Sequence, residues 1–112
     1  YRDLNVKAAV QYLNRVDAIF KYIEDDEERT KFVLASYNAG VGHVRDAMAL
    51  AEKHGKNPDK WSDVRVFIRN KAKPEFFNDP VVRHGYLRGE ETDNFVSEIY
   101  LRYKEYNDVI VD

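Results

Sequence analysis

The chain has 112 residues, enough for one domain with a hydrophobic core, since a domain of this size buries roughly 60–70% of the surface of its unfolded chain. Apolar residues make up 44% of the chain and charged residues 34%, which is typical of soluble globular domains and argues against disorder. The net charge is −2, and acidic and basic residues are interspersed after residue 28, so nucleic acid and anionic lipid surfaces are disfavoured as partners.

Two further classes are excluded by simple counts. The chain contains no cysteine, which rules out disulfides and thiolate chemistry. No apolar run approaches the roughly 20 residues that cross a bilayer, so the sequence predicts no transmembrane segment. The first residues, YRDL, do not resemble a signal peptide.

The first 23 residues predict one long amphipathic helix with Asp3 as its N-terminal cap. Its apolar positions recur at steps of three and four residues: Leu4, Val6, Ala9, Val10, Leu13, Val16, Phe20 and Ile23. The acidic run 24–28 interrupts this pattern and suits the start of a second helix, because negative charge stabilises the positive end of the helix dipole. We expect this second helix to reach Tyr37 or Asn38.

A third helix is predicted to begin near Gly42 and to end at the basic and glycine signals of residues 53–55. Its apolar face consists of Val44, Ala47, Met48 and Ala51. The pair Asn57-Pro58 is typical of a cap followed by proline at the first helical position, and predicts a short turn that carries Trp61 into a fourth helix.

Residues 73–90 predict an irregular loop, because two prolines and two glycines within them are incompatible with one continuous helix. After Glu90 and Glu91, a last helix is predicted from apolar residues at helical spacing: Phe95, Val96, Ile99, Tyr103 and Tyr106. No stretch shows convincing strand alternation. The expected fold is therefore all-α, with about five helices.

Spacing alone reveals little chemistry. The histidines His43, His54 and His84 lack the i, i+3 or i+4 partners of a preorganised zinc site, so no metal is expected. The acidic run 24–28 could hold a cation, but a solvated helix start explains it more simply. Neither a nucleophilic serine pattern nor a phosphate loop occurs.

The most informative stretch is LASYNAGVGHV, residues 34–44. Gly40 can take the left-handed backbone that ends a helix, and Gly42 allows the next helix to start close by. Tyr37 and Asn38 are then expected at a helix–helix corner. One interpretation is a plain helix end, with Tyr37 half-buried and Asn38 satisfying free carbonyls; the other is a corner that presents polar side chains to a ligand.

This stretch resembles the Ala-Tyr-Asn-Ala-Gly motif of the lytic transglycosylases with a goose-type-lysozyme-like fold, with Ser36 in place of alanine. Three other stretches resemble the same family in the expected order. LNVKAAVQYL (4–13) is similar to its Asn-Ile-x-Ala-Gly-x-x-Tyr-Leu helix. Similarity to the F type of membrane-bound lytic murein transglycosylase is found in residues 47–61 and in GYLRGEET (85–92) with Phe95, Val96 and Ile99.

The resemblance implies a lysozyme-like helical domain and a specific reaction. A single glutamate protonates the glycosidic oxygen between N-acetylmuramic acid and N-acetylglucosamine, and the muramic 6-hydroxyl closes to a 1,6-anhydro product without a cofactor. In the family, this glutamate, followed by serine, and a Gly-Leu-Met-Gln segment precede the helix that matches residues 4–13. Neither occurs here, so the catalytic glutamate is expected upstream of Tyr1. Residues 1–112 are then expected to be the C-terminal part of a catalytic domain, inactive alone.

The resemblance also assigns candidate substrate-binding residues. Tyr37 and Asn38 are expected to face the cleft. Gly40 is expected to leave room for the glycan to pass over the backbone. Phe95 stands where the family has a tyrosine, and either lines the groove or packs in the core. Arg88 is a candidate for contact with a peptide or muramyl carboxylate, although a surface ion pair is the simpler use.

Two functions stay open from the sequence. The first is a peptidoglycan lytic transglycosylase domain without its acid, with glycan strands as partner and a periplasmic, outer-membrane-associated location in the whole protein. The second is a non-catalytic helical module that binds peptidoglycan or another protein. The sequence does not specify an oligomeric state.

Overall fold

The computed structural model describes the backbone of residues 2–111 and the side chains of residues 6–108. This part of the chain is all-helical, as predicted, and contains no strand. Its helices are α1 (Arg2–Ile19), α2 (Asp26–Ala39), α3 (Val41–Lys53), α4 (Trp61–Asn70), α5 (Pro74–Phe77) and α6 (Gly89–Val111). None of them is long and apolar enough to cross a membrane.

Two sequence-based expectations fall at the N-terminal edge of this range. Tyr1, upstream of which the catalytic glutamate is expected, lies outside the described residues, so the position of that glutamate stays a prediction. The side chain of Leu4, the first apolar position of the predicted helix, also lies outside them.

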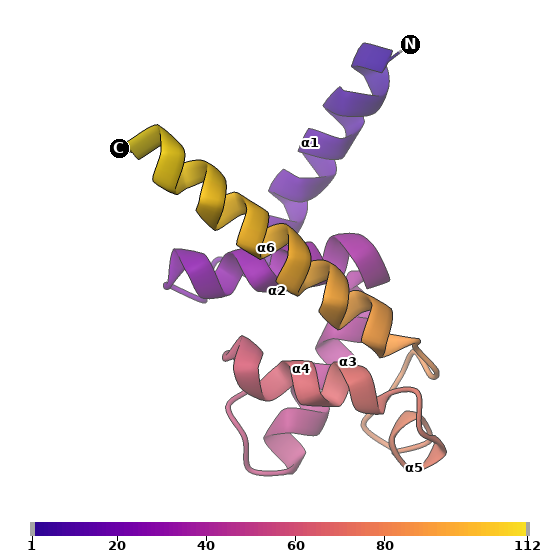
Figure 1. The fold of residues 1–112 in the computed structure, drawn as a ribbon. Helices are drawn as coiled ribbons and strands as arrows, with labels where there is room; N and C mark the ends of the chain where they lie inside the picture. Colours follow the sequence, from indigo (N-terminus) through magenta and orange to yellow (C-terminus); the bar gives the residue numbers. More distant parts are fainter. Residues whose placement is uncertain (1, 112) are drawn as a thin grey trace.

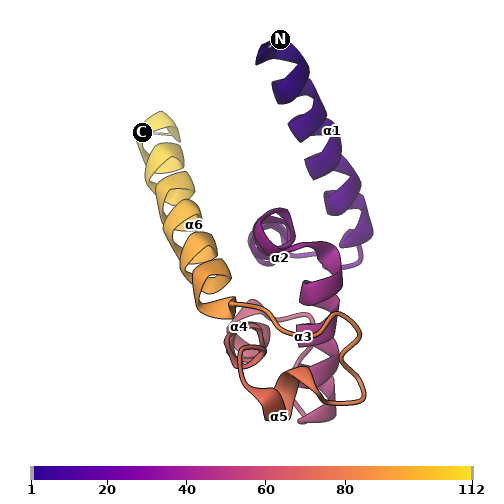
Figure 2. The same cartoon turned by 90° about the vertical axis from the view of Figure 1, so that its right-hand side faces the viewer.

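Helix α2 lies at the centre of the arrangement, between α1 on one side and α6 on the other (Figure 2). Helices α3 and α4 pack below it and against each other, and α4 also packs against α6 (Figures 1 and 2). The N-terminal half of α1 and the C-terminal half of α6 project from this body, and they diverge in the view of Figure 1. The packed centre and the projecting ends are therefore distinct parts of the molecule.

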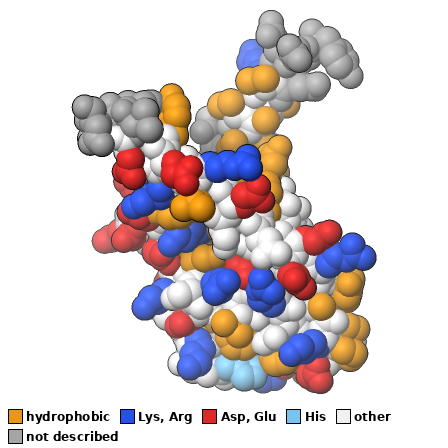
Figure 3. Space-filling model, in the orientation of Figure 1, with side chains coloured by type: hydrophobic (Ala, Val, Ile, Leu, Met, Phe, Trp, Pro, Cys, Tyr) orange, Lys and Arg blue, Asp and Glu red, His pale blue; other side chains and the backbone are white. Residues whose placement is uncertain are grey.

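Charged side chains of both signs share the surface of the packed centre. On the face drawn in Figure 3, the blue Lys and Arg side chains lie among the red Asp and Glu side chains. The described side chains of this face form no broad positive patch, in agreement with the interspersed charges of the sequence.

The core forms where α2, α3 and α4 meet. Phe32 of α2 is fully buried, and its ring lies 5.7 Å from that of Phe20 and 5.4 Å from that of Trp61. The predicted inner face of α3 is confirmed, because Val44, Ala47, Met48 and Ala51 are all buried. Burial of such side chains removes apolar surface from water and is the main force holding these helices together.

The boundaries of α1 correct two predictions. The helix includes Asp3, which therefore lies in its first turn instead of capping it, and it ends at Ile19 rather than continuing to Ile23. A turn over residues 20–22 follows, in which the N–H of Ile23 donates to the carbonyl of Phe20 at 2.9 Å. This turn buries both Phe20 and Ile23, which explains why the apolar pattern outlasts the helix.

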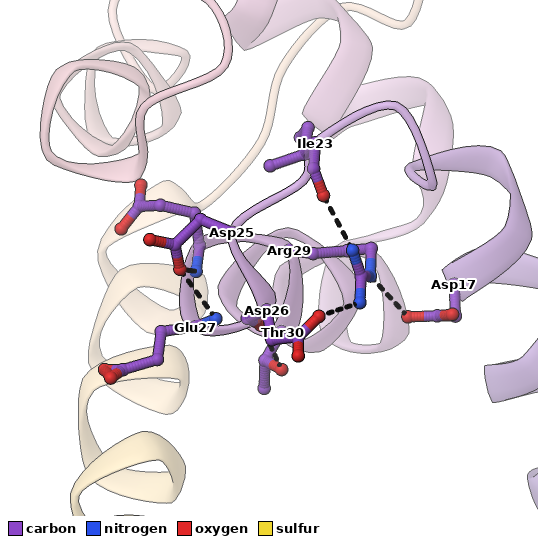
Figure 4. A network of polar contacts seen from close by, with 8 residues as sticks. Asp17, Ile23, Asp25, Asp26, Glu27, Arg29 and Thr30 are labelled. Atoms are coloured by element: carbon purple, nitrogen blue, oxygen red, sulfur yellow. Dashed lines mark hydrogen bonds and ion pairs between the residues drawn. The ribbon is translucent and has the colours of Figure 1, made fainter.

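The acidic run does start α2, as predicted. The carboxylate of Asp25 accepts hydrogen bonds from the N–H groups of Glu27 and Glu28, at 2.9 and 3.1 Å, and so caps the helix. Arg29 bonds to Asp26 and Asp17 and to the carbonyl of Ile23, which ties the helix start to α1 (Figure 4). The run is thus used for capping and for joining two helices.

The second half of the chain differs from the expected pattern in two details. Pro58 lies in a turn before α4, not at its first position, because the Asn57 side chain accepts from the N–H of Asp59 at 2.9 Å and closes an Asx turn. The irregular segment 73–90 contains the one-turn helix α5, with Pro74 at its start. Proline suits that position because the N–H it lacks has no intrahelical acceptor there.

Candidate functional site

The α2–α3 corner exists as predicted. Gly40 has φ +101°, a conformation that favours glycine, and its N–H donates to the carbonyl of Ser36 at 2.8 Å. Apart from Gly40 and its two chain neighbours, no atom of the described residues lies within 4 Å of the position that a Cβ would occupy there, so the backbone conformation, and not space, requires glycine. Tyr37 and Asn38 lie in the last turn of α2, both exposed.

Gly42 has a different role from the one predicted. It lies inside α3, which already begins at Val41, so it is not needed to start the helix. A Cβ at Gly42 would be 2.5 Å from Nε2 of His84. Glycine at this position leaves room for the His84 imidazole to lie directly on the helix backbone.

Helix α6 completes the corner. The hydroxyl of Thr92 donates to the side-chain oxygen of Asn38 at 2.8 Å, across 54 positions of sequence. Asn38 is therefore held by α6, whereas the alternative interpretation had it satisfying free carbonyls. One turn further along α6, the Phe95 ring stacks on Tyr37 with centroids 6.3 Å apart.

The aromatic contacts continue to α1. The Tyr12 ring lies edge-on to Tyr37, also with centroids 6.3 Å apart, so Tyr12, Tyr37 and Phe95 form a row across α1, α2 and α6. We call these three residues the aromatic row. Phe95 packs against the core, as one of its two expected uses requires, and its ring also faces Tyr37. Its expected place in a glycan-binding groove stays a prediction. Tyr37, half-exposed, offers the open surface of the row.

Arg88 does not belong to this row. Its guanidinium lies 3.5 Å from the carboxylate of Glu91, an exposed pair within one turn of the chain. It also lines a hollow of about 420 Å³ at the end of α4, together with Arg69 and Lys73. The surface ion pair expected as its simpler use is present.

Two residues of the site had no role predicted from the sequence. Tyr12 and Thr92 both lie in the stretches that resemble the family, but only contacts between helices reveal what they do. For Thr92 a signal exists in the sequence, since it lies three positions before Phe95 and therefore on the same face of α6.

Ser36 leads to a prediction about stability. Its side chain is fully buried, and its hydroxyl has no hydrogen-bond partner among the residues that the structure describes. A buried hydroxyl without a partner is costly, and serine is also a poorer helix former than alanine. Replacing Ser36 with alanine should therefore raise the free energy of unfolding by about 1 kcal/mol, measured by urea denaturation.

Ser97 provides the control, because it is exposed within α6 and its replacement by alanine changes helix propensity alone. The gain at Ser36 should exceed the gain at Ser97. Equal gains would mean that the Ser36 hydroxyl costs nothing where it lies.

A buried ionic cluster lies next to the corner and was not predicted. The ammonium of Lys71, fully buried at the end of α4, bonds to the carboxylate of Asp46 at 2.6 Å. The same carboxylate accepts from the N–H groups of Arg83 and His84, each at 2.9 Å. Lys71 also lies 2.7 Å from Nδ1 of His43. We call Asp46, Lys71 and His43 the buried cluster.

Burial and hydrogen bonds shift the pKa values of the buried cluster. Burial by itself raises the pKa of Asp46, but the N–H groups of Arg83 and His84 and the Lys71 ammonium outweigh it and lower that pKa. Burial lowers the pKa of Lys71, although Asp46 opposes this. Burial and the Lys71 charge lower the pKa of His43. The ionised carboxylate and the neutral imidazole are the favoured forms.

A hollow larger than the one beside Arg88 lies away from the corner. Its volume is about 520 Å³, and it opens between α2, α4 and α6, with Trp61, Val96 and Leu101 among its lining residues. Its cationic side chains Lys31, Arg65 and Lys104 are already paired with carboxylates. Within residues 6–108, no three histidine or acidic side chains gather as a metal site would require.

Comparison with known proteins decides the family. The model of the transglycosylase SLT domain matches residues 3–60, a little over half of the chain, including α1, the corner and α3. The chain belongs to the transglycosylase SLT domain family. The Tyr37–Asn38 corner thus lies within the matched part of this SLT domain, while Arg88, Thr92 and Phe95 lie beyond it.

Relatives extend the match to α6. The chain is 37% identical over 107 residues to the membrane-bound lytic murein transglycosylase F of Marinobacter nauticus, an alignment that covers 96% of the chain and 20% of the relative. The protein of the same name from Vibrio vulnificus is 35% identical over 100 residues, covering 89% and 18%. The one from Pseudomonas fluorescens is 42% identical over 79 residues, covering 70% and 16%. The chain thus spans about a fifth of the length of these relatives.

Proposed function

We propose that the chain forms one wall of the glycan cleft of a peptidoglycan lytic transglycosylase, with Tyr37, Asn38, Gly40 and Phe95 as substrate-binding residues. The reaction cleaves the bond between N-acetylmuramic acid and N-acetylglucosamine. A carboxylic acid protonates the glycosidic oxygen, the muramic 6-hydroxyl attacks C1, and the carboxylate accepts the hydroxyl proton. The 1,6-anhydro product forms without water or a cofactor.

One observation carries this proposal. The Thr92–Asn38 hydrogen bond joins the end of α2 to the start of α6 and leaves the exposed Tyr37 ring beside Phe95. Asn38 and Tyr37 belong to the family motif. An intramolecular ring closure needs the sugar held in one reactive geometry, and a fixed polar group next to an aromatic surface suits that task.

The acid is proposed to come from a part of the protein upstream of Tyr1. Two acidic side chains near the start of α6 are already engaged: Asp93 is buried and bonds to Arg65 and Arg69, and Glu91 pairs with Arg88. The projecting helices offer a surface for such a part, because Val6 and Val10 of α1 and Tyr103 and Tyr106 of α6 are exposed.

The location follows from the same proposal. The relatives carry names that describe them as membrane-bound and as acting on murein. We infer that the protein that contains this chain is periplasmic and is associated with the outer membrane. Arg88 is proposed to contact a carboxylate of the peptide stem, from the hollow that it shares with Arg69, Lys73 and Glu90.

The test uses the whole protein that contains this chain, acting on isolated peptidoglycan. Mass spectrometry of the products should find 1,6-anhydromuropeptides. Replacement of Tyr37 or Asn38 by alanine should lower kcat/KM by between about tenfold and a hundredfold, because the sugar loses its fixed position. Tyr22→Ala, which replaces an exposed tyrosine in the turn over residues 20–22, is the matched control and should leave the rate unchanged.

Three outcomes would contradict the proposal. Absence of anhydro products from the whole protein would favour the non-catalytic binding module. Products with a reducing muramic end would indicate hydrolysis by water. Release of anhydro products by the 112 residues alone would mean that the acid lies within them.

A further inference from the structure

The segment 83–88, which leads into α6, is attached to the buried cluster. The N–H groups of Arg83 and His84 donate to the Asp46 carboxylate at 2.9 Å, and the N–H of Leu87 donates to the carbonyl of Lys71 at 3.3 Å. The His84 ring lies on the backbone of α3 at Gly42. Asp46 and Lys71 therefore hold three backbone positions of this segment.

The state of His43 affects Lys71 directly. An ammonium only donates hydrogen bonds, so Nδ1 of His43 must accept, and the ring must be neutral with its proton on Nε2. The side chain of Lys71 is fully buried, and its partners are Asp46 and His43. A buried ammonium depends on these two bonds because water does not replace them.

Three groups face the His43 ring. A positive charge on the His43 ring is disfavoured by Lys71, at the end of α4, and by His84 of the segment 83–88. The centroids of the two histidine rings lie 6.1 Å apart. Asp46, on the same helix as His43, favours a positive charge. Burial acts with Lys71 and His84, so the pKa of His43 is lowered.

We propose that His43 is a pH-sensitive latch that holds the segment 83–88 against α3 and α4 while its ring is neutral. Protonation of Nδ1 puts an N–H donor opposite the Lys71 ammonium, so the 2.7 Å bond is lost. The ring is only partly buried and turns towards solvent. Lys71 then keeps a single partner, and the segment attached to Asp46 and Lys71 loosens.

The direction of the pH effect follows from linkage. With the latch closed, the pKa of His43 lies below its ordinary value of about 6.5, whereas an opened latch restores that value. Above pH about 6.5 the ring is neutral in both forms, and the latch has its full strength. As the pH falls below that value, the open form gains a proton that the closed form resists, so the latch weakens.

A functional consequence rests on the proposed function. Helix α6 begins at Gly89, directly after the latched segment, and carries Thr92 and Phe95 to the corner. Loosening at low pH then releases one side of the glycan wall. Amide exchange reports on the latch itself, so the latch can be confirmed or overturned independently of any activity.

The test is amide hydrogen exchange between pH 8 and pH 5 in the whole protein, corrected for the intrinsic pH dependence of exchange. Protection of the Arg83, His84 and Leu87 amides should fall below pH about 6.5, about tenfold for each unit by which the pKa of His43 differs between the two forms. The Gly40 amide, bonded to the Ser36 carbonyl, is the internal reference and should keep its protection.

The variant His43→Asn retains a side-chain acceptor near Nδ1 but does not titrate, so protection should become independent of pH over this range. His54→Asn removes a histidine that lies outside the cluster and should leave the pH dependence intact. The proposal is overturned if the three amides show no pH dependence in the unchanged protein. It is also overturned if His43→Asn keeps that dependence, including the case in which only His84→Asn removes it.

Discussion

Replacing Asp46 with alanine is expected to lower the free energy of unfolding by about 3–5 kcal/mol, measured by urea denaturation. The change leaves the Lys71 ammonium buried without its carboxylate and also removes the acceptor of two backbone N–H groups. Domains of this kind are stable by only about 5–15 kcal/mol, so the loss is a large share of the total.

The two partners of the ion pair, Asp46 and Lys71, should differ in how much stability is lost when each is replaced. Lys71→Met removes the buried cation but leaves Asp46 with its two backbone donors, so it should cost less than Asp46→Ala. Glu98→Ala breaks the exposed pair with Arg102 and is the matched control, with little change expected. Equal losses at Asp46 and Glu98 would contradict the view that burial of Lys71 makes this carboxylate essential.

Replacing Gly89 with alanine is the second change with a large expected effect. In an ordinary helix, this substitution adds up to about 1 kcal/mol of stability. At Gly89, however, a Cβ would lie 1.7 Å from the carbonyl oxygen of Ile68 and 2.9 Å from the Cα of Arg69. These are backbone atoms of α4, so α6 must move as a unit, and we expect a net loss of about 2–3 kcal/mol.

Gly42→Ala is the matched control, since Gly42 also lies in the first turn of a helix and also has close neighbours. The neighbour there is the exposed His84 side chain, which can swing away, so the cost should be much smaller than at Gly89. Nuclear magnetic resonance shifts of Asn38 and Tyr37 should change in Gly89→Ala, because Thr92 and Phe95 are displaced. A stable Gly89→Ala protein with unchanged shifts would show that α4 and α6 are not in such close contact.

Much of the fold could be predicted from the sequence because helices are encoded locally. The acidic run 24–28 predicted the start of α2, Gly40 its end, and residues 53–55 the end of α3, since caps and stop signals act over a few residues. The boundary at Ile19 was missed because the apolar spacing of Phe20 and Ile23 is the same in a helix and in the tight turn that buries them.

Some residues of the candidate site could likewise be predicted from the sequence, and others could not. Tyr37, Asn38 and Gly40 could be identified because they form one continuous stretch with a helix-ending glycine. The position of Thr92 on the same face as Phe95 could be predicted, but its hydrogen bond to Asn38 could not, because Asn38 lies 54 positions away. The buried cluster was missed for a similar reason: Lys71 and Asp46 are ordinary surface residues by type, and only the packing of α3 against α4 excludes water from them.

The sequence by itself therefore determined the all-helical class, the helix–helix corner at Gly40 and the family whose motif that corner carries, because each depends on neighbouring residues. The tertiary structure decided which side chains share a surface: the aromatic row, the Asn38–Thr92 bond and the cluster beneath segment 83–88. These contacts join helices far apart in the chain, and their geometry depends on how the apolar faces pack, which no local pattern of residues specifies.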